Sequence, residues 1–426
     1  MFEAPYALHS THLRHSRHLR HLRHLNLMGT FLDTVPVSAI IRIRDLMLTL
    51  KDPYRLDQGD VSFDAPDTVK QAMAKAIVDN RSHYLPTTGV PRLRELLAEK
   101  MRTKNGIPVG SPDEIVPTNG GTHAIWAALH ALFEPGDEMI VSDPEWPPTM
   151  AIAVAAGAKP VAVPLHERLD WRWDLDELER AITPKTRAIY VNSPNNPTGG
   201  VLTRADLERI AAIAQERNLW VLSDEAYEDI VFRGEHVSIA SLPGMYERTI
   251  PLYTFSKSYA MTGLRLGYLA IKDEAVRARA VKVVAYTTTN VNSVVQYGGI
   301  GALEGSQDCV KGFRDELKAR RDLFYTGLAD AAPDILTGNP PDGAFYAFVK
   351  INAEWAREHG ITGPSVSWAM AEHLIKHGRI GCVPGVDFGP SAEGYMRLCF
   401  GRSRQELAGA LASMKAVLAQ ETVQRS

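Results

Sequence analysis

Short apolar segments alternate with amphipathic helical patterns through the middle of the chain, and this alternation constrains the fold more than any other feature. Three such segments lie at 139–142, 188–192 and 219–223, each with apolar residues at consecutive positions. Between the last two, Thr203 and Asp206 have the spacing of a capping box at the start of a helix. Strands that are apolar on both sides belong to a parallel sheet covered by helices on both faces. The sequence therefore predicts an α/β fold with a mostly parallel sheet.

An earlier helical pattern lies at 66–80. Its apolar residues Val69, Met73, Ala76 and Ile77 recur at helical spacing. The spacing predicts a helix with an apolar stripe.

The pattern changes toward the C-terminus, where helices and strands no longer alternate regularly. A long helical pattern at 306–329 precedes a strand-like run at 344–351, and another run at 395–400 precedes a last helix capped by Ser403 and Glu406. Mixed order predicts a smaller α+β domain, which we expect the N- and C-terminal segments to share. The expected organisation is a low-complexity extension at 1–27, an N-terminal arm and part of the small domain at 28–75, a large domain at 76–305 and a small C-terminal domain at 306–426.

Composition and missing motifs exclude several classes of protein. The 426 residues carry a net charge of -3 with 23% charged residues, without the basic field of a nucleic-acid-binding protein. No run of about 18 apolar residues predicts a membrane helix, and no G-x-G-x-x-G or P-loop spacing indicates a dinucleotide or nucleoside triphosphate site. The three cysteines, Cys309, Cys382 and Cys399, form no CxxC pair, which argues against a disulfide framework. We expect a cytoplasmic protein with no nucleic-acid or membrane partner.

The first 27 residues differ from the rest, because histidines recur at every third position from His9 to His24 with arginines between them. A metal-binding tract, an organelle transit peptide and a low-complexity extension all fit this composition. A three-residue period does not place the histidines on one helical face. We favour the extension, with Met28 as a candidate start, and predict no metal site.

Four polar segments stand where a parallel sheet binds its ligands, after strands and before helices. Segment 119–122 offers backbone amides to a phosphate, although glycine before a helix is often only a turn. Segment 193–199 contains two prolines, two asparagines and a glycine. These residues would form a rigid turn even without a ligand. Asp224 ends an apolar run and needs a polar partner, which helix capping or a salt bridge would also supply. Lys257 has Arg265 eight residues later. It is either an ordinary surface lysine or an amine in a buried site, where a nearby cation lowers its pKa.

Together these segments resemble the class I/II aminotransferases of the pyridoxal-phosphate-dependent fold-type I superfamily, to which aspartate aminotransferase belongs. The resemblance covers nearly the whole chain from about residue 50, and NNPTG, DEAY and SKS followed by an arginine are jointly specific. The strings that carry it are 84–89 with Leu93 and Arg94, 119–122, 143–147, 193–199, 224–227, 254–265 and Arg397.

The resemblance implies pyridoxal 5′-phosphate as cofactor and a role for each matching residue. Lys257 matches the lysine that forms a Schiff base with the cofactor and moves a proton in catalysis. Asp224 matches the carboxylate that pairs with the ring nitrogen, and Asn196 and Tyr227 match the donors to the ring oxygen. The other matches are a phosphate site (Gly121, Thr122, Thr254, Ser256 and Arg265), a ring-stacking aromatic residue (Trp146) and a tyrosine that reaches the cofactor phosphate of the neighbouring subunit (Tyr84). The last of these implies a homodimer with shared active sites.

Arg397 is the candidate for binding the substrate's α-carboxylate. In the predicted strand at 395–400, Met396, Leu398 and Phe400 share one face, so Arg397 points to the other. A guanidinium there can bind a carboxylate with two parallel hydrogen bonds. A salt-bridged surface arginine is the alternative.

The identity of the substrate stays open at this point. Gly59 resembles part of the family's N-terminal loop that closes over substrate, although the fuller glycine–acid–proline string is missing. Asn196 completes the expected substrate-binding set together with Trp146 and Phe345. The two aromatic residues could line an aromatic or mixed pocket, although each is equally plausible as packing. In the aspartate-specific branch a partner-subunit arginine binds the distal carboxylate, whereas the matching stretch 286–292 contains no arginine. Aspartate would therefore need another cation.

The resemblance implies an enzyme that passes the amino group of an L-amino acid to a 2-oxo acid, with 2-oxoglutarate as the expected acceptor, in a ping-pong cycle. Two alternatives remain. The same residues could run a β-elimination or γ-replacement, because the cofactor supplies the carbanion chemistry and the pocket selects its outcome. A cofactor-binding regulator would need a DNA-binding module ahead of residue 50, and the N-terminal tract has no helix-turn-helix pattern.

Overall fold

The computed structural model describes residues 31–36 and 38–423. The chain divides into two units, 1–36 and 37–426, and the described part of the first contains the 3-10 helix η1 (Phe31–Thr34). The predicted extension at 1–27 lies outside the described residues. The second unit contains two sheets and the α-helices. Within the described ranges, each helix is too short or too polar to cross a bilayer.

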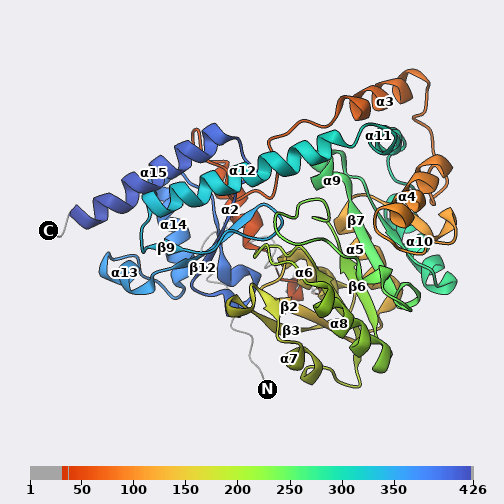
Figure 1. Cartoon of the computed structure of the whole chain (residues 1–426), viewed down its shortest axis with the longest axis horizontal. Coiled ribbons are helices and arrows are strands. Elements are labelled where there is room, and N and C mark those ends of the chain that lie inside the picture. The colour runs from red at the N-terminus through yellow and green to blue at the C-terminus, as the bar shows by residue number, and fades with distance from the viewer. Residues whose placement is uncertain (1–30, 37, 424–426) are drawn as a thin grey trace, which may run out of the picture. The chain divides into compact units, whose positions relative to one another are not determined.

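The larger sheet has eight strands in the order β1-β8-β7-β6-β5-β2-β3-β4, several of which are labelled in Figure 1. The central pairs, from β7 through β6, β5 and β2 to β3, are parallel, whereas β1, β8 and β4 add antiparallel pairs. The strands are β1 (Ile115–Thr118), β2 (Glu138–Asp143), β3 (Lys159–His166), β4 (Arg172–Trp173), β5 (Thr186–Asn192), β6 (Trp220–Asp224), β7 (Thr249–Thr254) and β8 (Gly267–Ala270). The prediction of a large, mostly parallel sheet is confirmed.

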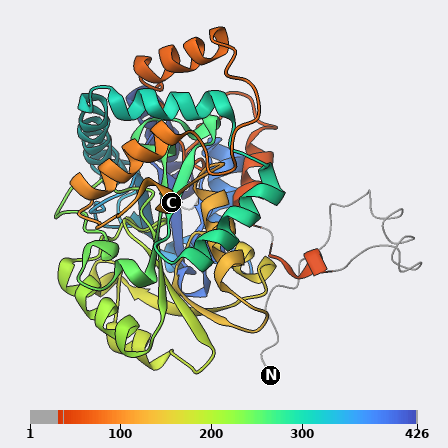
Figure 2. The same cartoon turned by 90° about the vertical axis from the view of Figure 1, so that its right-hand side faces the viewer.

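Helices cover both faces of this sheet, which is why its strands are apolar at consecutive positions. Met139 and Val141 of β2 pack with α5, α6 and α10 on one face, whereas Ile140 packs with α7 and α8 on the other. Toward β1 and β8, helices α4 and α11 take over the second face (Figures 1 and 2). The bounds are α4 (Pro91–Thr103), α5 (Gly121–Leu132), α6 (Pro147–Ala155), α7 (Leu175–Arg180), α8 (Arg204–Glu216), α10 (Glu274–Thr288) and α11 (Ser293–Glu304).

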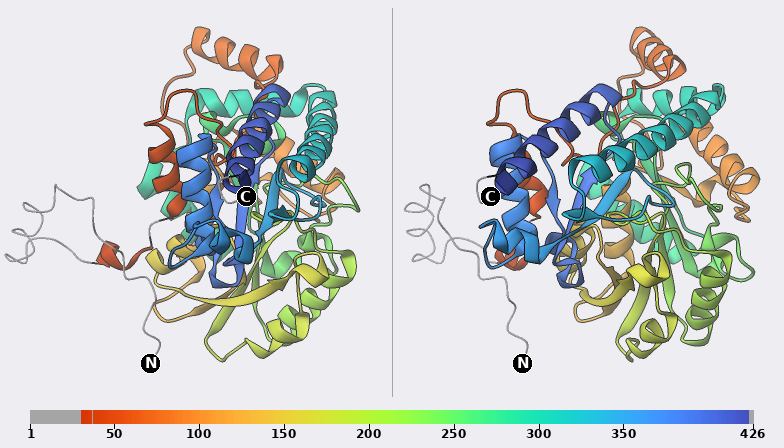
Figure 3. Two further views of the ribbon diagram at one scale, coloured as in Figure 1. Left: turned by 90° about the vertical axis from the view of Figure 1, so that its left-hand side faces the viewer. Right: turned by 60° about the vertical axis from the view of Figure 1, so that its left-hand side comes forward.

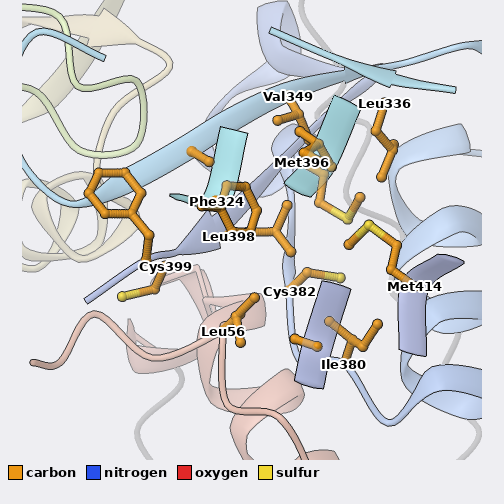
Figure 4. Close-up of a cluster of buried hydrophobic side chains, with 14 of the residues drawn as sticks. Leu56, Phe324, Leu336, Val349, Ile380, Cys382, Met396, Leu398, Cys399 and Met414 are labelled. Carbon is orange, nitrogen blue, oxygen red and sulfur yellow. The ribbon is translucent and has the colours of Figure 1, made fainter. Parts of the chain in front are cut away.

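A smaller antiparallel sheet has the order β11-β12-β10-β9. Its strands are β9 (Leu336–Thr337), β10 (Tyr346–Ile351), β11 (Val383–Pro384) and β12 (Tyr395–Cys399). Helices α12 (Asp308–Ala331) and α15 (Arg404–Val423) lie side by side against it, as Figure 3 shows. Phe324 of α12 and Met414 of α15 meet Val349, Met396 and Leu398 of the sheet in one buried cluster (Figure 4). The other helices here are α13 (Ala353–Glu358) and α14 (Val366–Gly378).

The N-terminal segment joins this smaller sheet. Backbone hydrogen bonds connect the Tyr54 N–H to the Arg379 carbonyl and the Cys399 N–H to the Leu56 carbonyl. Before them, α2 (Ala39–Met47) packs on α14 through buried apolar side chains. The fold-class prediction, in which the N- and C-terminal segments share a smaller α+β part, is confirmed. The domain boundaries at 75/76 and 305/306 stay predictions.

The capping box expected at the start of α8 is present. Thr203 Oγ1 accepts a hydrogen bond from the Asp206 N–H at 3.2 Å, and Asp206 Oδ2 accepts one from the Thr203 N–H at 2.8 Å. These bonds satisfy backbone donors that the first turn leaves free, and so they fix where the helix begins.

The helix expected at 66–80 is α3 (Asp67–Val78), and only part of its apolar stripe is buried. Val69 is buried, whereas Ile77 is 62% exposed. The helix packs on α11, where Gly298 leaves room for the side chains of Val69 and Met73. Ile77 lies eight positions after Val69 and is rotated from it by roughly 80° around the helix axis, at the margin of this contact.

Candidate active site

Five strand ends meet at one edge of the large sheet. The parallel strands β5, β6 and β7 end there in Asn192, Asp224 and Thr254. Strand β8 runs in the opposite direction and begins there at Gly267, whose register partners are Thr254 and, at the end of β1, Thr118. Because ligands of such sheets bind beyond the carboxyl ends of the strands, the polar segments that follow these ends are in the expected place.

These segments surround a cavity of about 290 Å³, close to the lower end of the usual size for ligand sites. All site residues expected from the sequence line it except Tyr84 and Phe345. The predicted residues on its wall are Gly59, Gly121, Thr122, Trp146, Asn196, Asp224, Tyr227, Thr254, Ser256, Lys257, Arg265 and Arg397. Residues from distant parts of the sequence therefore share one cavity, while the role of each stays a prediction.

Lys257 enters the cavity from α9 (Phe255–Ser258), a single turn that follows β7 directly. Its Nζ donates a hydrogen bond to the Gly59 carbonyl at 2.5 Å. Burial lowers the pKa of Lys257 to about 8; the arginines of the cavity act in the same direction, and Asp60 opposes them. An amine of this kind is neutral in an appreciable fraction near neutral pH, which suits it to act as a nucleophile or a base.

Asp224 presents a carboxylate to the cavity from the end of β6. Its Oδ2 accepts a hydrogen bond from the Tyr190 hydroxyl at 2.7 Å, and its Oδ1 accepts one from the Ala226 N–H at 3.1 Å. Burial raises the pKa of Asp224, and these two hydrogen bonds oppose the rise because they favour the ionised form. Each oxygen keeps a further acceptor position, so the group can receive a proton donor from a ligand.

Hydroxyls, backbone amides and a guanidinium gather on another part of the wall. Thr254 Oγ1 accepts a hydrogen bond from the Ser256 N–H at 3.1 Å and donates one to Ser256 Oγ at 2.8 Å. Helix α5 begins at Gly121, so its unpaired N–H groups are available there. The Arg265 guanidinium rests against Gly120, where a Cβ would lie 2.5 Å from Nη2. This donor set fits an anion such as a phosphate.

Arg397 projects into the cavity from β12 and is only 2% exposed. Nη1 donates to Asn196 Oδ1 at 3.0 Å and Nη2 to the Asp57 carbonyl at 2.7 Å, while Nε has no hydrogen-bond partner. Its cation also lies 4.5 Å from the centroid of the Tyr346 ring. These partners carry no negative charge, and a buried cation is costly without a counter-ion. A ligand carboxylate would supply one.

Five further residues line the cavity, none of which had an expected role: Ile40, Ile125, Asn192, Ala226 and Tyr346. Tyr346 had a usable signal, because it follows Phe345 and neighbouring residues of an extended segment point in opposite directions. Its hydroxyl lies 2.7 Å from that of Tyr227. Ile40, from α2, had no such signal.

The two exceptions lie outside the cavity for different reasons. Phe345 is fully buried behind the wall, with its ring edge-on to Tyr227, so the expected aromatic wall is displaced by one residue to Tyr346. Tyr84 is 88% exposed. Its reach into a neighbouring subunit stays a prediction.

Comparison with known proteins identifies the family of this chain. The family described as aminotransferase class I and II matches residues 51–414. The chain is 37% identical over 390 residues to aromatic-amino-acid aminotransferase 2 of Thermococcus litoralis, covering 91% of this chain and 97% of that protein. It is 36% identical to the aspartate aminotransferase of Pyrococcus abyssi, covering 92% and 98%.

Solved structures show the same relationship. The aspartate aminotransferase of Thermus thermophilus with maleate is similar with a TM-score of 0.83 at 33% identity, over 92% of this chain and 99% of that one. The aromatic aminotransferase of Pyrococcus horikoshii is similar with a TM-score of 0.81 at 36% identity, over 89% and 99%. The chain therefore belongs to the class I and II aminotransferase family, enzymes that transfer amino groups between amino acids and 2-oxo acids.

Proposed function

We propose that this enzyme binds pyridoxal 5′-phosphate in the cavity and passes the amino group of an L-amino acid to a 2-oxo acid in a ping-pong cycle. One observation carries the proposal: four charged or titratable groups with complementary chemistry line the same cavity. They are the Lys257 amine, the Asp224 carboxylate, the Arg265 guanidinium and the Arg397 guanidinium.

The donors and acceptors of the wall fit a phosphorylated pyridine. The Arg265 guanidinium, the hydroxyls of Thr254 and Ser256, and the first N–H groups of α5 would hold the phosphate. Asp224 would accept a hydrogen bond from the protonated ring nitrogen, since both its oxygens have room for another donor. Trp146, at the start of α6, would stack on the ring.

Two side chains are free to donate to the ring oxygen. Asn196 uses its Oδ1 to accept from Arg397, which leaves its Nδ2 protons available. The hydroxyls of Tyr227 and Tyr346 share one hydrogen bond of 2.7 Å. When Tyr346 donates in that bond, the Tyr227 proton can be given to the ligand.

Lys257 is the group that would move protons. When bound, pyridoxal phosphate would supply an electron sink that makes the Cα proton of the amino acid acidic. Burial lowers the pKa of Lys257 to about 8. Its Nζ would take this proton from Cα and then give it to the cofactor. A lysine with an ordinary pKa would be protonated and unable to accept it.

Arg397→Ala is expected to lower kcat/KM for amino acid and oxo acid alike by about 30-fold or more, mostly through KM, because removing one member of a buried charge pair costs about 2–5 kcal/mol. Arg397→Lys should give a smaller loss, since it keeps the charge without the two-pronged geometry. Steady-state kinetics with both substrates measures the effect.

Arg320→Lys is the matched control for Arg397→Lys. Arg320 is 7% exposed and lies on α12, where it is paired with Glu316, so its replacement should leave KM within about twofold. Unaltered KM values for both substrates in Arg397→Ala would show that another cation binds the α-carboxylate.

The side chain of the amino donor is expected to be uncharged. Among the described residues, the cations on the cavity wall are Lys257, Arg265 and Arg397, and each already has a proposed ligand. Ile40 and Tyr346 add apolar surface. The names of relatives do not decide the point, because they include aromatic amino acids, aspartate and arginine. 2-Oxoglutarate, the expected acceptor, would then need a partner-subunit group for its second carboxylate.

The active unit is proposed to be a homodimer with shared sites. Tyr84 and Tyr286 are 88% and 83% exposed, and large exposed aromatic residues are typical of interfaces. Their segments adjoin, since Thr87 Oγ1 donates to the Thr289 carbonyl at 2.8 Å. A second subunit covering this surface would allow Tyr84 to reach the partner's cavity.

The proposal is tested by the absorbance spectrum of the purified protein with added pyridoxal phosphate, titrated with a panel of amino acids and no acceptor. We expect a visible band from cofactor attached to Lys257, which matching donors convert to the spectrum of the amino form, uncharged donors before aspartate. A band that persists while ammonia and an oxo acid appear would identify a lyase. No visible band would contradict the cofactor assignment.

A further inference from the structure

Two carboxyl groups stand next to each other at the end of β6, and each is held by a buried tyrosine of a neighbouring strand. Tyr190 of β5 donates to Asp224 Oδ2 at 2.7 Å, and Tyr253 of β7 donates to Glu225 Oε2 at 2.6 Å. The two tyrosines are 0% and 2% exposed. Asp224 lines the cavity, whereas Glu225 points away from it toward Ser238 and His236. The two pairs have the same chemistry and differ in whether the carboxylate meets a ligand.

We propose that Tyr190 is a positioning residue for Asp224, holding that carboxylate in the place and the charge state that amino-group transfer requires. The proposal rests on the proposed role of Asp224 as the partner of the cofactor's ring nitrogen. Tyr190 is not among the residues that line the cavity, so it would act on a ligand only through Asp224.

The contact between Thr149 and Tyr190 indicates which group donates in the Tyr190–Asp224 hydrogen bond. The Tyr190 oxygen lies 3.3 Å from Thr149 Oγ1, which donates to it. A phenol has one proton to give, so Tyr190 gives it to Asp224. With the Ala226 N–H on the other oxygen, both ends of the carboxylate are held, and the plane of the group cannot turn away from the cavity.

The same bond also favours the charged form of Asp224, against the burial that disfavours it. Burial raises the pKa of Asp224 and the adjacent Glu225 raises it further, whereas the Tyr190 hydroxyl, the Ala226 N–H and Lys257 lower it. Burial also raises the pKa of Glu145 to about 8, so this neighbour is mostly neutral at pH 7. The titratable groups that face Asp224 are Glu145, Tyr190, Glu225, Tyr227 and Lys257. Without the Tyr190 proton, the balance moves toward a protonated, neutral Asp224.

Tyr190→Phe tests this with the loss of one oxygen atom, and Tyr253→Phe is the matched control. In Tyr190→Phe we expect kcat to fall about 10- to 100-fold, the range for a hydrogen bond to a charged group, with KM for the amino acid within about twofold because Arg397 is untouched. The acid limb of the kcat profile and of the cofactor's absorbance titration should move to higher pH, and pyridoxal phosphate should dissociate more readily.

Tyr253→Phe should lower the melting temperature as much as Tyr190→Phe does, while it leaves kcat, the acid limb and cofactor dissociation at wild-type values. Thr149→Val, which removes the donor to Tyr190, should shift the acid limb in the same direction by a smaller amount, and it serves if Tyr190→Phe does not fold. The wild-type spectrum comes first, because a missing cofactor band there contradicts the proposed function and not Tyr190. Given a normal wild type, an unmoved acid limb in Tyr190→Phe, or equal shifts in both tyrosine variants, overturns the proposal.

Discussion

Lys257→Ala is expected to remove the visible absorbance of attached cofactor and to lower kcat by at least about 10⁴-fold, the upper range for the loss of one positioned acid–base group. The amine sits on a single helical turn at the end of β7, and its position is fixed by a hydrogen bond to the Gly59 carbonyl. No rotation of a neighbouring side chain replaces it, since the other two cations of the described cavity wall are arginines, which stay protonated.

The folded state should survive this change. A buried amine with a lowered pKa is not a source of stability, because burial disfavours its charged form. Lys257→Arg is the informative companion, since it restores the positive charge without an amine that can be neutral, and we expect it to be as inactive as the alanine variant. Near-ultraviolet circular dichroism checks the fold. A variant at position 257 with a normal spectrum and turnover would show that the wrong lysine is assigned.

The sequence was sufficient for the large sheet and for the residues at its edge, and the physical reason is the same for both. A strand covered by helices on both faces must be apolar at consecutive positions, as in 188–192 and 219–223, so its end is visible where polar residues resume. Parallel strands bring those ends together. Asp224 and Thr254 could therefore be placed at one edge without knowledge of the register between strands.

Contacts that depend on register or on packing of distant segments could not be predicted in this way. Tyr190 looks like an ordinary apolar member of its strand, and its hydroxyl gains meaning only because Asn192 and Asp224 are register partners. Ile40 reaches the cavity from a helix whose position is set by packing on α14. The exposure of Ile77 likewise follows from where Gly298 allows α11 to approach.

The shift from Phe345 to Tyr346 has a local cause. Ala344 has a left-handed backbone with φ of 57°, a conformation that residues other than glycine rarely adopt. The strand β10 starts two residues later, at Tyr346, so its alternation of sides is set only from there. Sequence alone gives the residue types near the site, and the backbone decides which of two adjacent aromatic residues faces it.

Asp224→Asn is expected to lower kcat by about 10³-fold, because a buried charge that loses its partner costs about 3–5 kcal/mol, while cofactor affinity changes much less. We expect Arg265, Thr254 and the start of α5 to support the affinity from another part of the cavity wall. Asparagine keeps the shape and can still accept the Tyr190 proton, so the variant isolates the loss of charge. Transient kinetics of the half-reaction and equilibrium dialysis of pyridoxal phosphate measure the two quantities separately.

Asp143→Asn is the control, because this aspartate is also buried at a strand end but contacts Ser391 outside the cavity wall; kcat should stay within about twofold of wild type. The decisive comparison is the double variant Asp224→Asn/Tyr190→Phe. If Tyr190 acts by holding and charging Asp224, its removal should add little once the charge is gone, and the two effects should be strongly non-additive. Additive losses would mean that Tyr190 supports the reaction through another group, and near-normal turnover of Asp224→Asn alone would mean that the ring nitrogen has a different partner.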